Sequence, residues 1–102
     1  MKRRYILAPE AVRDLAAIWR YLKRESSREV ADRIEFAIRD KIGFLADTQG
    51  AGHRRDDLTS AHVKFFAVYS YLIVYRPETK PLQVASILHG NRDIERILRQ
   101  RL

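Results

Sequence analysis

Hydrophobic residues in the first half of the chain recur with the period of an amphipathic helix. Residues 3–8 alternate as a short strand that stops at Pro9, and the helical spacing then runs to about Arg24. Ile18 lies off the apolar stripe of this helix, so we expect it to be the most exposed apolar side chain there. The predicted buried stripe, spaced i, i+3, i+4, i+7 and i+10, is Val12, Leu15, Ala16, Trp19 and Leu22.

A second helix of about 20 residues follows a pair of serines. Ser26 and Glu29 have the spacing of a capping box, with Ser26 as the N-cap. Gly50 and Gly52 indicate where the helix ends. Because the link to the first helix is short, the two should form an antiparallel hairpin. The apolar stripe of the second helix is Val30, Ile34, Ala37, Ile38, Ile42 and Leu45.

The pattern changes to β-strands after a polar loop at residues 50–62. Residues 63–68 form one strand, and the unbroken apolar and aromatic run at 71–75 predicts a central strand covered on both faces. Two prolines mark a turn at 76–81, and 82–89 is the last strand. The tail from Asp93 returns to helical spacing.

The element order is therefore β-α-α-β-β-β with a short terminal helix. It predicts an α+β fold in which an antiparallel-rich four-stranded sheet packs against a helical hairpin. The first strand must join that sheet from the far end of the chain. Because no linker or repeat interrupts residues 1–102, we expect a single domain.

The charge of the chain narrows its partners. Its 20 Lys+Arg and 13 Asp+Glu give a net charge of +7, which favours nucleic acid, an acidic protein or a membrane surface. The absence of cysteine excludes disulfide scaffolds and thiol nucleophiles. No apolar run approaches the roughly 20 residues of a membrane span, and the apolar stretch after Arg4 is too short for a signal peptide. These patterns predict a cytoplasmic protein.

Two segments carry candidate chemistry. In the loop from Gly50 to Leu58, arginine forks are suited to phosphate or carboxylate, although the loop could equally be solvated, with Asp56 and Asp57 pairing with the neighbouring arginines. At the end of the last strand, His89 could act in acid–base chemistry or be hydrogen-bonded to the chain. Asp93 suits the start of the last helix without any catalytic role. The histidines lack metal spacing, so we expect no metal site.

The aromatic residues of the strands allow two interpretations. Stacking platforms for single-stranded nucleic acid have similar clusters. Tyr71 and Tyr75, however, share a strand face with Ile73, which favours an ordinary core. Trp19 is expected to pack under the sheet or to line a groove.

The chain resembles the ParE/RelE toxin superfamily of type II toxin–antitoxin systems. The resemblance lies in the element order and in the segments Tyr5–Ala11, Asp14-Leu15 and Tyr71–Pro77. The segments 52–58 and 87–93 resemble the ParE branch in particular. That resemblance implies a toxin that inhibits DNA gyrase without bond-making chemistry of its own. The RelE branch cuts messenger RNA and is the alternative; its catalytic set would here be only His89, Arg76 and Lys64.

The resemblance also implies partners. A ParD-like antitoxin with an acidic C-terminal segment would fold onto the toxin, and operator DNA would be contacted only through that antitoxin. Neither a cofactor nor a membrane is implied. The predicted antitoxin contacts are Leu15, Ile18, Trp19 and Leu22. The predicted target contacts are Arg54, Arg55, Arg92, Arg96, Arg99 and Arg101.

An acidic antitoxin tail is then the leading explanation of the positive net charge. Attraction between the two would speed the association of toxin and antitoxin. A basic nucleic-acid-binding module without toxicity is the remaining hypothesis, and it predicts salt-sensitive binding of DNA.

Overall fold

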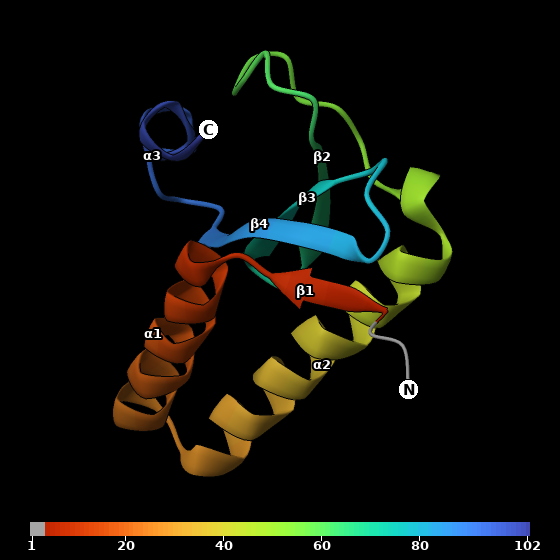
Figure 1. The fold of residues 1–102 in the computed structure, drawn as a ribbon. Helices are drawn as coiled ribbons and strands as arrows, with labels where there is room; N and C mark the ends of the chain where they lie inside the picture. Colours follow the sequence, from red (N-terminus) through yellow and green to blue (C-terminus); the bar gives the residue numbers. More distant parts are fainter. Residues whose placement is uncertain (1–3) are drawn as a thin grey trace.

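The computed structural model describes residues 4–102, which form three α-helices and one four-stranded sheet (Figure 1). The elements are β1 (Tyr5–Leu7), α1 (Pro9–Glu25), α2 (Arg28–Asp47), a short 3-10 turn (Gln49–Ala51), β2 (Lys64–Val68), β3 (Tyr71–Arg76), β4 (Leu82–His89) and α3 (Ile94–Arg101). The strand order is β1-β4-β3-β2, with β1 parallel to β4 and the other neighbours antiparallel. The predicted α+β fold is confirmed. The start of the first predicted strand, residue 3, lies outside the described residues.

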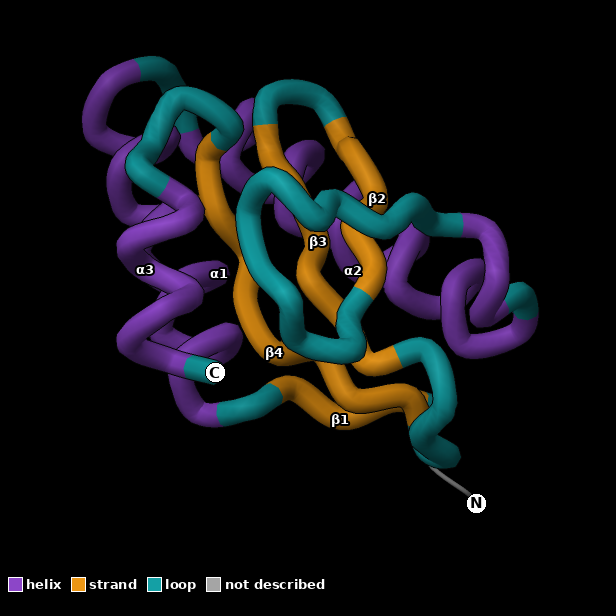
Figure 2. Tube along the Cα trace, turned by 90° about the horizontal axis from the view of Figure 1, so that it is seen from above, coloured by secondary structure: helices purple, strands orange, loops and turns teal. Residues whose placement is uncertain are grey.

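Both faces of the sheet are covered. Figure 1 shows α1 and α2 on one side and α3 on the other. Along β3, Ile73 and Tyr75 belong to the core on the hairpin side, whereas Val74 packs with Leu98 of α3. The prediction that this strand is central and buried on both faces is thus confirmed. Figure 2 shows that the loop after the 3-10 turn runs beside α3 over the second face.

The buried face of α1 differs from the predicted stripe. Ala11, Asp14 and Leu15 are buried and Ile18 packs against the core, while Val12 is 51% exposed. The prediction that Ile18 is the most exposed apolar residue is therefore wrong. The cause is a charged residue at a core position, because Asp14 occupies the i+3 site from Ala11. The buried face of α1 is therefore not a purely apolar stripe, and apolar spacing alone does not predict it.

The start of α2 is shifted by one residue from the prediction. Ser27, not Ser26, is the N-cap, and its Oγ accepts a hydrogen bond from the Val30 N–H at 3.1 Å. Ser26 instead ends α1, where its own N–H donates to the Leu22 carbonyl. Each serine therefore serves a different helix.

The loop after α2 is pinned to β3 by one phenol. The Tyr75 hydroxyl donates to the Gln49 carbonyl at 2.8 Å and accepts from the Gly52 N–H at 2.9 Å. A Cβ at Gly52 would lie 2.6 Å from that hydroxyl oxygen, so only glycine fits. The neighbouring His53 forms a bridge with Phe65 of β2. These contacts fix the beginning of the cationic loop.

No helix within residues 4–102 combines the length and the apolar character needed to cross a bilayer.

Candidate functional site

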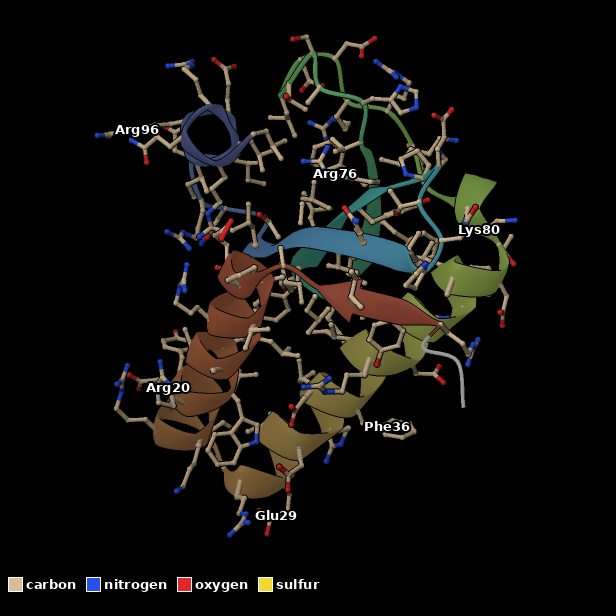
Figure 3. The ribbon with its side chains drawn as sticks, in the orientation of Figure 1. Arg20, Glu29, Phe36, Arg76, Lys80 and Arg96 are labelled. Carbon is tan, nitrogen blue, oxygen red and sulfur yellow. The ribbon has the colours of Figure 1, made fainter. Side chains whose placement is uncertain are left out.

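The three residues considered for RNA cleavage do not converge. His89 is paired with Tyr71 at one end of β3, while Lys64 and Arg76 lie at the other end, five residues or roughly 17 Å along the strand. Lys64 is paired with Tyr75 on the hairpin side, whereas Arg76, the next residue of β3, points to the side of α3 (Figure 3). An acid–base group and two cations spread over both faces cannot act on one phosphate.

His89 is held by its surroundings. Its Nδ1 accepts a hydrogen bond from the Asn91 N–H at 3.1 Å, and its ring lies edge-on to Tyr71 with centroids 5.2 Å apart. The neutral ring therefore carries its proton on Nε2. The interpretation of His89 as hydrogen-bonded to the chain is confirmed. Asp93 caps α3, as expected, by accepting from the Arg96 N–H.

Arg101 binds a buried carboxylate. Its guanidinium makes two hydrogen bonds to Asp14, at 2.7 and 3.0 Å, and one to the Ser86 hydroxyl at 3.0 Å. Asp14 is only 8% exposed and also accepts from the Ile87 N–H of β4 at 3.0 Å. The hydrogen bonds and the charge of Asp14 raise the pKa of Arg101. We expected Arg101 to be a target contact, but it ties α3 to α1 and β4.

The other predicted target contacts divide into paired and unpaired cations. Arg54 pairs with Asp56 at 3.3 Å and Arg55 with Asp57 at 2.8 Å, which confirms the expected pairing of this loop. Arg99 pairs with Glu95, one turn earlier in α3. Within residues 4–102 no ion pair is formed by Arg92 or Arg96, and both are exposed, so these two are the most available; Figure 3 shows Arg96 on the outer side of α3.

The predicted antitoxin contacts differ in accessibility. Leu15 is buried in the core, and Ile18 packs against it. Trp19 does not pack under the sheet: its Nε1 donates to Asp32 of α2 at 2.8 Å and so joins the two helices. Leu22 is half-buried. The large apolar side chains that α1 does expose are Val12 and Tyr21. Val12 was predicted to be buried, which is wrong, and the sequence pattern did not single out Tyr21.

A cleft of about 390 Å³ lies between α1 and the end of the sheet where β4 stops. It gathers His89 and Arg92, both predicted as site residues, and adds Tyr21, which sequence reasoning missed. The sequence does show that Tyr21 lies one helical turn from Ala17 and Ile18 on α1. It does not show that this face of α1 packs beside the end of β4. The lining residues are Asp14, Ala17, Ile18, Tyr21, Tyr71, Ile87, His89, Asn91 and Arg92.

Comparison with known proteins gives a consistent result. A family model described as the ParE toxin of the type II toxin–antitoxin system parDE matches residues 5–94. Among solved structures, the chain resembles one described as the chromosomal ParDE toxin–antitoxin system from P. aeruginosa, with a TM-score of 0.69 and 20% identity. That match covers 83% of this chain and 92% of the other. No curated protein matches significantly.

Proposed function

The chain belongs to the ParE toxin family of type II toxin–antitoxin systems, and we propose that it arrests growth by inhibiting DNA gyrase without catalysing a reaction itself. The family match over residues 5–94 is the observation that carries this proposal. The ParE branch, as the sequence resemblance implies, acts on gyrase, whereas the RelE branch needs a catalytic cluster.

The geometry of the sheet supports a non-catalytic toxin over a ribonuclease. Cleavage beside a 2′-hydroxyl requires a base and cations within reach of the same phosphate. His89 is separated from Lys64 and Arg76 by the length of β3, and those two cations lie on opposite faces of the sheet. Moreover, the Nδ1 of His89 is occupied by the backbone of Asn91. Both features weigh against RNA cleavage.

We propose a ParD-type antitoxin as the partner that silences the toxin, through an acidic segment laid along α1. Support comes from the exposed Val12 and the half-buried Trp19, which share a helix face seven positions apart, and from the half-buried Ile18 and Leu22. The net charge of +7 complements an acidic segment. Operator DNA would be reached only through the antitoxin.

Induction of the chain in bacterial cells separates the two modes of toxicity. A gyrase inhibitor predicts growth arrest with broken chromosomal DNA and full-length transcripts, and His89→Ala should remain toxic because the imidazole has no catalytic task. A ribonuclease predicts shortened transcripts and loss of toxicity in His89→Ala. Shortened transcripts with intact DNA would overturn the proposal.

The antitoxin surface can be tested independently. Val12 is exposed, so Val12→Asp should leave folding and toxicity unchanged but weaken rescue by the co-expressed antitoxin, because a carboxylate would repel an acidic segment. Gln100→Asp, on the exposed side of α3, adds the same charge elsewhere and serves as the control. Equal rescue of both variants would remove α1 from the proposed interface.

A further inference from the structure

The cleft between α1 and the end of β4 is lined by aromatic rings. Tyr21, Tyr71 and His89 contribute three of its nine lining residues, and Ile18 and Ile87 make up part of its apolar wall. The edge-on contact of His89 with Tyr71 holds both rings in place. Tyr21 is 52% exposed, so its ring is free to cover a ligand. Flat aromatic surfaces of this kind stack on nucleobases.

The charge at this cleft suits one anion. Arg92 has no ion pair within the described part of the chain, and it lines the cleft. The carboxylate of Asp14 is also present, but Arg101 neutralises it. Arg24 lies 5.9 Å from the Tyr21 ring, but its charge is paired with Glu25 at 3.6 Å, so Arg92 is the cation that the cleft offers. An arginine fork binds phosphate oxygens in a bidentate manner.

Hydrogen-bonding groups accompany these rings. The Tyr71 phenol is protonated at neutral pH and can donate; burial, and then the neighbouring Tyr21 phenol, raise its pKa further. Because Nδ1 of His89 is already an acceptor, Nε2 is the remaining donor of that ring. The Asn91 side chain can both donate and accept at a base edge.

We propose that this cleft binds a nucleoside 5′-monophosphate, with the base against Tyr21 and the phosphate on Arg92. Its volume of about 390 Å³ lies within the range of small-molecule sites, and rings beside one unpaired arginine match a flat base joined to a phosphate. A simple inorganic anion would leave the rings unused. The inference does not depend on the toxin function.

Calorimetric titration of the purified full chain tests the site. AMP should bind at least about tenfold more tightly than adenosine or inorganic phosphate, since each of those lacks one half of the recognised chemistry. Arg92→Ala and Tyr21→Ala should each weaken AMP binding about tenfold. Tyr21→Phe, which keeps the ring, and Lys80→Ala, which removes a charge at the opposite end of the sheet, should bind AMP as well as the unmodified chain (Figure 3).

Three results would overturn the proposal: no saturable binding of AMP, equal binding of AMP and phosphate, or equal weakening by Lys80→Ala and Arg92→Ala. Circular dichroism of each variant checks the fold, which these exposed positions should not disturb. The 5′-phosphorylated end of a nucleic-acid strand carries the same base and phosphate as a free nucleotide. A 5′-phosphorylated adenine octamer that binds more tightly than AMP would identify a strand end as the source, and equal or weaker binding would identify the free nucleotide.

Discussion

Replacement of Arg101 by alanine should destabilise the protein strongly, because this residue in the last turn of α3 binds a buried carboxylate. The guanidinium provides two of the three hydrogen bonds that Asp14 accepts, and only the Ile87 N–H would remain. Ser86, which is fully buried, would lose its arginine partner as well. The substitution therefore leaves a carboxylate buried beside the sheet without its counter-charge.

The size of the effect follows from the burial of this pair. The Asp14 side chain is 7% exposed and the Arg101 side chain 23%, so water screens the pair little. Breaking a buried pair by removing one partner costs about 3 kcal/mol. For a domain of this size, a loss of about 3 kcal/mol lowers Tm by roughly 12–24 °C. Because Arg101 is in the last turn of α3, the loss should also loosen the packing of Ile94 and Leu98 on the sheet.

Thermal and urea unfolding of Arg101→Ala, with Arg99→Ala as the control, measures this loss of stability. Arg99 is in the same helix and pairs with Glu95, but both are exposed, so its removal should cost at most about 0.5 kcal/mol. A double-mutant cycle with Asp14→Ala should give a coupling energy of about 2 kcal/mol or more. Equal unfolding midpoints for the two arginine variants, or a coupling near zero, would show that the Arg101–Asp14 pair does not hold α3 on the sheet.

Three further predictions concern caps, the buried phenol and the free cations. Ser27→Ala should cost about 1 kcal/mol in urea unfolding while Ser26→Ala costs less than about 0.5, and the reverse order would contradict the observed N-cap. Tyr75→Phe should cost about 1–3 kcal/mol at neutral pH, because Gly52 N–H and the Gln49 carbonyl lose their partner. Burial raises the pKa of Tyr75, so its contribution to stability is fully present below the pKa of the unfolded chain and falls above about pH 10. Tyr75→Phe should therefore lose less stability than the unmodified chain at alkaline pH, with Tyr71 supplying the remaining loss, and an unchanged loss would contradict this. Arg92→Ala with Arg96→Ala should reduce toxicity in cells without lowering Tm, whereas the exposed pair Arg20→Ala with Lys80→Ala should not; equal toxicity of both double variants would exclude these target contacts.

Local pattern was sufficient to predict the elements of this fold. The last strand, Leu82–His89, matches the prediction residue for residue, and α1 and α2 end close to the expected positions. These boundaries depend on periodicity, prolines and small polar residues, all of which act over a few positions. The cap of α2 was misplaced because two adjacent serines carry the same local signal, and only the backbone geometry assigns each to a helix.

The candidate site could be predicted only in part, because its contacts are non-local. Asp14 and Arg101 are 87 positions apart, and the sequence near either residue does not predict that they pair. His89 and Arg76 belong to neighbouring strands, and only the antiparallel register puts them at opposite ends of the sheet. Tyr21 joins His89 in the cleft because α1 packs beside the end of β4. Residue types therefore indicated candidates, while the topology decided which of them meet.

A supercoiling assay with purified gyrase measures whether the chain inhibits this enzyme. We expect the folded chain at micromolar concentration to block ATP-dependent supercoiling of relaxed plasmid. His89→Ala should inhibit equally, and a ParD-type antitoxin should restore supercoiling. Full supercoiling in the presence of the folded, growth-arresting chain would contradict gyrase inhibition.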